Sequence, residues 1–210
     1  VWQGIDSVAH FNKIKARFFS EYGFQSFPEY QSVLKYAPEE RDHNIYSDVM
    51  MAHQRGGQVA NSRIEKITAD EYRKPKDFPS TLYMSILLQG DAIKTAIEAH
   101  RRDKPYCWGS LFWQHNDCWP VASWASRDWY GRWKAQHYFA RPAFDDILVS
   151  PLAGENTLNV RLVSDRRKTV RGKLRITVMD MDGALLSENT RSLTVAPNAS
   201  RNVYSADISG

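Results

Sequence analysis

The chain has 210 residues, of which 42% are hydrophobic and 12% aromatic, so it can bury a sizeable core in one large domain or two small ones. Its 28 Lys and Arg against 24 Asp and Glu leave a net charge of +4, too small and too scattered for a nucleic-acid-binding surface. No apolar run approaches the length of a membrane span, and Cys107 and Cys118 have the spacing of neither a zinc site nor a CxxC redox pair.

The first 60 residues give one strand signal and two helical ones. An apolar run over 17–20 predicts a buried strand, with Glu21 at its C-terminal end. Ser26, which can cap a helix, and Pro28 precede a helical pattern over 29–37. One or two helical turns are expected over 47–54, followed by a polar loop around 55–57.

The clearest element is a long helix that Ser80 can cap. Leu82, Ile86, Ile93 and Ile97 recur at helical spacing up to Arg101. A second buried strand is expected over 106–113, then a tryptophan-rich loop, and then a helix over 129–139 on which Trp129 and Trp133 are packing residues. This alternation is typical of a parallel α/β unit, and two such units make only an incomplete barrel.

From Asp145 onward short alternating runs replace the helical pattern. Strands are expected over 157–163, 173–179, 193–195 and 203–208, with turns between them. This density of strands predicts an immunoglobulin-like β-sandwich. Because about 65 residues fall short of the ~100 usual for that fold, we expect one or two strands to be missing or supplied elsewhere. The predicted domains are residues 1–142 and 143–210.

Glu21 is the first candidate for chemistry. Glycoside hydrolysis with retention needs two carboxyl groups about 5 Å apart, and a nucleophilic carboxylate belongs at the C-terminal end of a barrel strand. Glu21 has that position. The alternative is that Glu21 only caps the strand end or pairs with Arg17.

Two sequence blocks resemble one enzyme family. The first block is Arg17-Phe18-Phe19-Ser20-Glu21-Tyr22-Gly23-Phe24-Gln25-Ser26-Phe27-Pro28. The second block runs from Trp113-Gln114-His115-Asn116-Asp117-Cys118-Trp119-Pro120 through Ser123-Trp124-Ala125-Ser126 to Gly131-Arg132-Trp133-Lys134-Ala135-Gln136-His137-Tyr138-Phe139. Together they resemble the β-mannosidases of the glycoside hydrolase family shared with β-galactosidases and β-glucuronidases.

This resemblance implies a fold and a mechanism. Residues 1–142 are expected to be the C-terminal part of a catalytic TIM (β/α)8 barrel, and residues 143–210 the β-sandwich domain that follows it. The implied activity is that of a retaining exo-β-mannosidase, which removes terminal non-reducing β-D-mannosyl residues from an oligosaccharide or glycoconjugate through a covalent glycosyl-enzyme. The resemblance makes Glu21 the catalytic nucleophile and places Trp113 under the cleaved sugar.

Several further residues are candidates for binding substrate. Trp119 and Trp124 can stack on sugar or plug the rim of the barrel. Asn116 and Asp117 can bind sugar hydroxyls, although Asp117 can equally cap its loop. His53 lies in a short segment that resembles a loop flanking the site in the family. We expect no metal and no cofactor, because there is no HExxH motif or clustered triad and this chemistry needs no metal.

The general acid/base of the resembling family is a Glu preceded by Asn, and no Asn-Glu dipeptide precedes Glu21. We therefore expect it upstream of Val1, in an N-terminal part of the same enzyme. Trp2 and Gly4 resemble the loop between the two catalytic Glu residues, which agrees with that position. By itself the chain is expected to be inactive. The resemblance suggests the periplasm, the lysosome or secretion rather than the cytoplasm.

Two other functions stay open. One is the activity of a related exo-β-glucosaminidase or β-galactosidase. The other is a non-catalytic carbohydrate-binding module, in which the aromatic loop binds glycan and Glu21 is structural.

Overall fold

The computed structural model describes residues 4–209, so Trp2 lies outside the described part. The chain divides into two compact units. The first holds the residues up to His100 together with Tyr106–Phe144, and the second holds Arg101–Pro105 together with the residues from Asp145. Within residues 4–209 no helix is long and apolar enough to cross a membrane.

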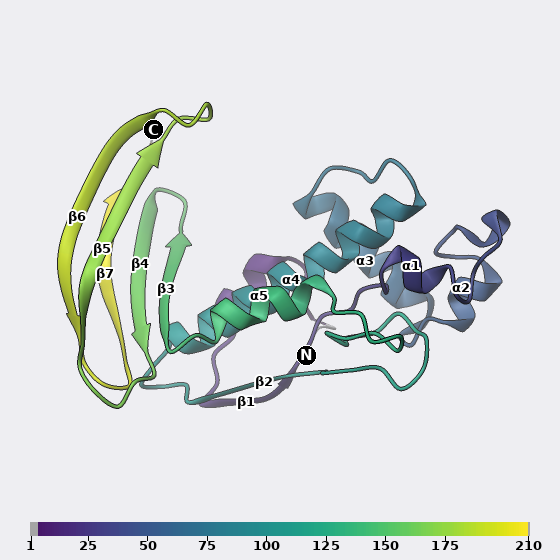
Figure 1. The fold of residues 1–210 in the computed structure, drawn as a ribbon, viewed down its shortest axis with the longest axis horizontal. Helices are drawn as coiled ribbons and strands as arrows, with labels where there is room; N and C mark the ends of the chain where they lie inside the picture. The colour runs from purple at the N-terminus through teal and green to yellow at the C-terminus, as the bar shows by residue number, and fades with distance from the viewer. Residues whose placement is uncertain (1–3, 210) are drawn as a thin grey trace. The chain divides into compact units, whose positions relative to one another are not determined.

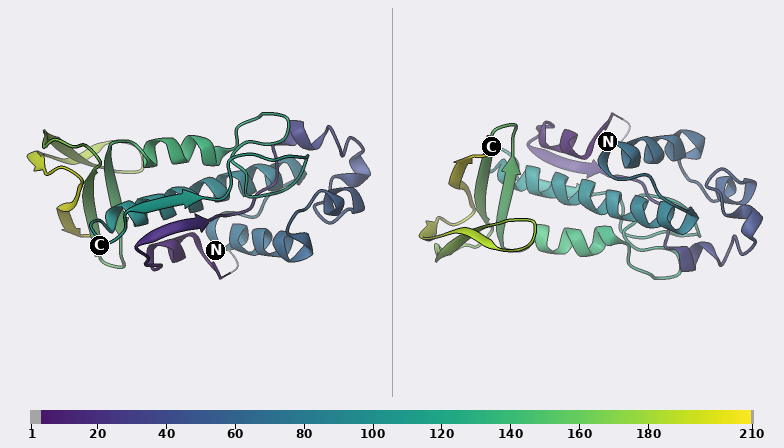
Figure 2. Two further views of the ribbon diagram at one scale, coloured as in Figure 1. Left: turned by 90° about the horizontal axis from the view of Figure 1, so that it is seen from below. Right: turned by 90° about the horizontal axis from the view of Figure 1, so that it is seen from above.

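The first unit pairs a small sheet with a layer of helices (Figure 1). Its strands and helices are β1 (Phe18–Tyr22), α1 (Tyr30–Val33), α2 (Asp48–Ala52), α3 (Gly57–Glu71), α4 (Phe78–Arg102), β2 (Gly109–Phe112) and α5 (Ala135–Ala143), with 3-10 helices at Val8–Asn12 and Glu40–Asp42. The strands β1 and β2 run parallel, as the alternation of strand and helix predicts. Figure 2 shows α4 running along the two strands.

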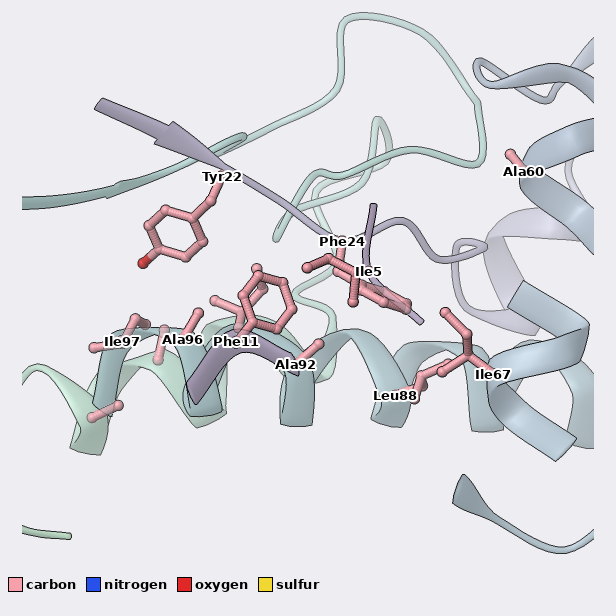
Figure 3. Packing of buried hydrophobic residues seen from close by; sticks show 13 residues of the cluster. Ile5, Phe11, Tyr22, Phe24, Ala60, Ile67, Leu88, Ala92, Ala96 and Ile97 are labelled. Carbon is pink, nitrogen blue, oxygen red and sulfur yellow. The ribbon is translucent and has the colours of Figure 1, made fainter. Parts of the chain in front are cut away.

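One face of this sheet is buried against α4. The ring of Tyr22 points from β1 toward the helix, where Ala96 and Ile97 meet it in the main hydrophobic cluster (Figure 3). Phe19 and Phe112 pack against the same cluster. Phe18 and Leu111 are each 55% exposed, so the expectation of two buried strands is wrong. Among the described residues β1 and β2 each pair only with the other.

Several helix boundaries differ from those expected. The pattern over 29–37 yields only the single turn of α1, and the predicted polar loop at 55–57 leads directly into α3, a helix that the pattern did not reveal. The long helix begins at Phe78, and Asp77 rather than Ser80 supplies the cap, since its Oδ1 accepts the Ser80 N–H at 2.8 Å.

The expected helix over 129–139 also begins later. Trp129 and Trp133 precede α5, which starts at Ala135. The backbone N–H of Lys134 donates to the Ser126 carbonyl at 2.8 Å, so the loop turns back on itself before the helix starts.

The second unit contains five strands in two antiparallel sheets (Figure 1). The strands are β3 (Ile147–Ala153), β4 (Thr157–Ser164), β5 (Val170–Met179), β6 (Leu185–Val195) and β7 (Ala199–Asp207). One sheet has the order β3-β4-β7, and the other is the β5-β6 hairpin. The expectation of an all-β region is confirmed, although β3 was not predicted and β6 is much longer than the expected segment over 193–195.

Candidate active site

Glu21 lies in an irregularity of β1. Phe19 is in register with Ser110 and Tyr22 with Phe112, so Ser20 and Glu21 together stand opposite the single residue Leu111. Such a bulge turns side chains out of the regular alternation and is common beside active sites. Phe19 and Tyr22 point into the helix-facing cluster, whereas Ser20 and Glu21 are exposed. The carboxyl group therefore lies on the face of the sheet opposite α4.

No hydrogen bond or ion pair within residues 4–209 holds the Glu21 carboxylate. Arg17, the partner that a purely structural role would require, lies instead with its guanidinium 5.7 Å from the ring centroid of Tyr106. A carboxylate that is exposed and held by no hydrogen bond or ion pair is available to react with a substrate.

Trp113 follows β2 at the same end of the sheet. Its N–H donates to the Tyr22 carbonyl at 2.6 Å, which fixes the backbone of Trp113 beside the residue that follows Glu21. Phe112 packs toward the helices, so the alternation of the strand directs Trp113 toward the Glu21 face. The indole is 42% exposed.

Gly23 allows the two strand ends to approach each other closely. A Cβ at this position would lie 2.5 Å from the Trp113 carbonyl oxygen and 2.9 Å from Cδ1 of Trp124. Only glycine fits there without displacing one of them. Glu21, Trp113 and Trp124 are thus brought into one neighbourhood.

Other predicted site residues form a second group. The Nδ1–H of His53 donates to the Pro120 carbonyl at 2.5 Å, and the His53 ring stacks on that of Tyr36 with 4.0 Å between the ring centroids. The Trp119 ring centroid lies 5.8 Å from that of His53. His53 and Trp119 therefore support each other.

Asn116 and Asp117 differ in exposure. The exposed Asn116 donates through its side chain to the Asp117 carbonyl at 3.1 Å. Asp117 is buried, and its Oδ1 accepts from the Ser123 hydroxyl at 2.6 Å. Burial raises the pKa of Asp117 above its usual range, although the Ser123 hydrogen bond and the charge of Lys134 oppose that shift. This carboxylate braces the loop.

The sequence patterns missed a set of buried polar side chains behind the strand ends. Gln25, Ser26, Gln89, Ser123 and Lys134 are all 0% exposed. The Gln25 amide donates at 2.7 Å to Gln54 Oε1 and at 3.1 Å to the Ala122 carbonyl. One sequence signal was present, because Gln89 falls on the apolar stripe of α4 between Ile86 and Ile93, where a polar side chain needs a buried partner.

Metal ligands do not gather in the described part of the chain. Within residues 4–209 no three His, Cys, Asp or Glu side chains come close enough together to hold a metal ion.

Comparison with known proteins gives consistent matches. Residues 156–210 match the family model described as a mannosidase Ig/CBM-like domain. The β-mannosidase of Capra hircus is 34% identical over 166 residues, which cover 72% of this chain and 18% of that protein. The β-mannosidase of Rattus norvegicus is 32% identical over 174 residues, covering 77% of this chain and 20% of that protein. The chain thus spans about a fifth of the length of these relatives.

Solved structures agree with the sequence matches. The β-D-mannosidase of Dictyoglomus thermophilum superimposes with a TM-score of 0.89 at 29% identity, covering 100% of this chain and 26% of that one. An exo-chitosanase of Amycolatopsis orientalis has a TM-score of 0.70 at 16% identity, over 96% of this chain and 25% of that one, which shows a common fold alone. The expected resemblance is confirmed: by sequence and by fold, this chain is similar to a part of the β-mannosidases.

Proposed function

We propose that this chain supplies the nucleophile half of a retaining exo-β-mannosidase site, with Glu21 as the nucleophile. The observation that carries the proposal is the bulge in β1, which presents an exposed, unpaired carboxylate beside Trp113 and away from the helix-facing core. The similarity to β-mannosidases of 28% to 36% identity supports the choice of sugar.

The mechanism follows from the chemistry of a carboxylate at an anomeric carbon. Glu21 attacks C1 of a terminal β-mannosyl unit through an oxocarbenium-like transition state, while an acid protonates the departing oxygen. A glycosyl-enzyme ester forms on Glu21. The group that acted as the acid then acts as a base and activates water, which hydrolyses the ester with overall retention. Trp113 stacks under the apolar face of the ring during both steps.

In this proposal the second carboxyl group comes from outside these residues. No Asn-Glu dipeptide precedes Glu21, and we propose that the remaining N-terminal part of the same enzyme provides the acid/base. The proposed domains are residues 1–142 as the C-terminal part of a TIM barrel and residues 143–210 as an immunoglobulin-like domain. Parallel β1 and β2 with α4 on one face fit that barrel, in which catalytic groups lie at the C-terminal ends of strands.

The other predicted site residues contribute to the site in different ways. Trp124 packs against Gly23 and shapes the wall beside Glu21. His53 and Trp119 form an aromatic rim, and the exposed Asn116 binds a sugar hydroxyl. Asp117, which is buried against Ser123, contributes by holding the loop rather than by direct contact with substrate.

Two alternatives are separated by experiment. The similarity to exo-chitosanases is only 15% to 16% in identity, against 28% to 36% for β-mannosidases, which favours mannoside over glucosaminide. Rates on aryl β-mannoside, β-glucosaminide and β-galactoside distinguish these enzymes. A carbohydrate-binding module would hydrolyse none of them.

Replacement of the nucleophile tests the mechanism in the full-length protein that carries these residues. Glu21→Ala should lower kcat on an aryl β-mannoside by about 10⁴-fold or more, because no covalent intermediate can form. Added azide should restore turnover and give the α-mannosyl azide, since the small anion enters the space left by the carboxylate. Glu39→Ala, at an exposed loop position, is the matched control. Equal activity of both variants would refute the assignment.

A further inference from the structure

Lys134, directly before α5, is a fully buried lysine whose amino group is held by oxygen atoms of two other segments. Its Nζ donates to the Ser26 hydroxyl at 2.9 Å, to the Ser123 carbonyl at 3.3 Å and to the Ser26 carbonyl at 3.4 Å. An ammonium group has three protons, which matches these three acceptors.

The two segments that Lys134 joins are those that bear the proposed site. Ser26 lies five positions after Glu21, and Ser123 directly precedes Trp124. The backbones of the two serines also pair, with both N–H···O distances at 3.0 Å. Lys134 therefore acts on the connection between the nucleophile strand and the tryptophan loop.

Gln89 on α4 completes this connection from a third element. Its Oε1 accepts from the Ser26 hydroxyl at 2.8 Å, and its amide donates to the Phe24 carbonyl at 2.8 Å and more weakly to the carbonyls of Ser123 and Ala125. Gly23 and Trp124, which approach each other closely, are thus each adjacent in the chain to residues of this network.

Among residues 4–209, the charged groups that shift the pKa of Lys134 are Asp117 and Asp128, which lie in the loop before α5. Burial lowers the pKa of Lys134 to about 8, and the carboxylates of Asp117 and Asp128 oppose this shift. The segment after β1 presents the hydroxyl and carbonyl of Ser26, and α4 presents the amide of Gln89, all uncharged. Near neutral pH the group is an ammonium ion, whereas in alkaline solution it loses one of its three donors.

We propose that Lys134 is a positioning residue, whose ammonium group ties the segment after β1 to the loop bearing Trp124 and thereby sets the place of Glu21 relative to Trp113 and Trp124. This inference rests on the proposed function. It predicts that formation of the glycosyl-enzyme depends on the protonation of a lysine that touches neither substrate nor Glu21.

The test is the pH profile of covalent inactivation of the full-length protein by 2,4-dinitrophenyl 2-deoxy-2-fluoro-β-D-mannopyranoside. Dinitrophenolate departs without a general acid, so ionisation of the acid/base does not impose an alkaline fall. The rate constant for wild-type protein should fall above about pH 8. Lys134→Met should react about 10²-fold more slowly, as expected for a displaced reacting group, and should show no such fall.

Three further variants make the assignment specific. Ser26→Ala removes an acceptor of the ammonium group, so the alkaline fall should move to lower pH. Cys118→Ser should leave the profile unchanged, which excludes the exposed thiol as the titrating group. Lys66→Met, at an exposed lysine paired with Asp70 on α3, should react like wild type.

The outcomes separate the two proposals. Absence of any labelling at Glu21 in wild-type protein refutes the proposed function. Labelling at Glu21 with no fall near pH 8, or with the same profile in Lys134→Met, overturns the role of Lys134 alone. If Lys134→Met does not fold, the wild-type and Ser26→Ala profiles decide, since a fall that is absent or unmoved by Ser26→Ala also overturns it.

Discussion

The loop around Lys134 and the β5-β6 hairpin differ in how far their side chains are buried. Behind the candidate site, polar side chains are completely buried and joined by hydrogen bonds, as with Ser26, Gln89 and Lys134. In the hairpin most side chains are exposed, and Leu174 and Val195 are its buried hydrophobic residues. Buried polar networks specify one arrangement of the backbone, while an exposed hairpin tolerates many sequences. Substitutions should therefore act strongly in the first region and weakly in the second.

The largest effect on stability should come from the titration of Lys134. Its pKa is about 8 in the folded chain against 10.5 when unfolded, so between these values the unfolded chain binds more protons. Raising the pH through this window should increase the free energy of unfolding by up to about 3 kcal/mol. Below pH 8 the lysine is protonated in both states and contributes no dependence on pH.

Urea unfolding of wild type and Lys134→Met at about pH 7 and pH 10.5 measures this contribution. The contribution is the change, between these two pH values, in the difference between the free energies of unfolding of the two proteins. A difference that stays constant across the window would show that Lys134 keeps an ordinary pKa. Stability and the inactivation rate should change in opposite directions as the pH rises, which general alkaline unfolding cannot produce.

A smaller effect on stability is expected where the backbones of Gly23 and Trp113 approach each other. Gly23→Ala places a methyl group 2.5 Å from the Trp113 carbonyl oxygen and should lower the free energy of unfolding by about 1–3 kcal/mol, the usual cost of overpacking. Gly172→Ala on β5 meets nothing within 4 Å and should be neutral or stabilising by about 0.5–1 kcal/mol. Equal destabilisation of both variants, measured by urea unfolding, would remove the contrast between the two regions.

Loss of an aromatic platform should mainly affect activity. Trp113→Ala in the full-length protein should lower kcat/KM on an aryl β-mannoside about 10- to 10²-fold, because the sugar loses a stacking surface. Trp129→Ala, at a loop residue that is 51% exposed, should change kcat/KM less than about twofold. Equal losses in both variants would argue that Trp113 is only one of several packing residues.

The smallest effect belongs to the hairpin. Met179→Thr, at a residue on β5 that is 58% exposed, should change the free energy of unfolding by less than about 0.5 kcal/mol and leave hydrolysis unaltered. A loss above 2 kcal/mol, which is typical of a core position, would show that this face is covered by something in solution.

Regular elements could be predicted where one physical pattern dominates. The stripe of Leu82, Ile86, Ile93 and Ile97 predicted α4, and alternation predicted most of the strands. By contrast, α3 was missed because it begins at Gly57 and buries only a few positions, among them Ala60, Ile64 and Ile67. The start of α5 was misplaced because the loop before it is as aromatic as a packed helix.

The residues of the candidate site likewise divide into those that a local sequence pattern predicts and those that it does not. Glu21 and Trp113 could be proposed because each follows a strand signal and both lie in blocks that resemble β-mannosidases. Gly23 and Lys134 could not, because their roles depend on contacts across about 90 to 110 positions of sequence, which no local periodicity encodes. Gln89 was the exception, as a polar residue on an apolar stripe.

The most direct test of the account is to find where the fluorosugar attaches. Full-length protein inactivated with 2,4-dinitrophenyl 2-deoxy-2-fluoro-β-D-mannopyranoside should be digested, and the labelled peptide sequenced by mass spectrometry. We expect a single 2-deoxy-2-fluoromannosyl adduct in the peptide containing Arg17-Phe18-Phe19-Ser20-Glu21-Tyr22, on the side chain of Glu21. An adduct on another carboxylate, or inactivation that proceeds unchanged in Glu21→Ala, would contradict it.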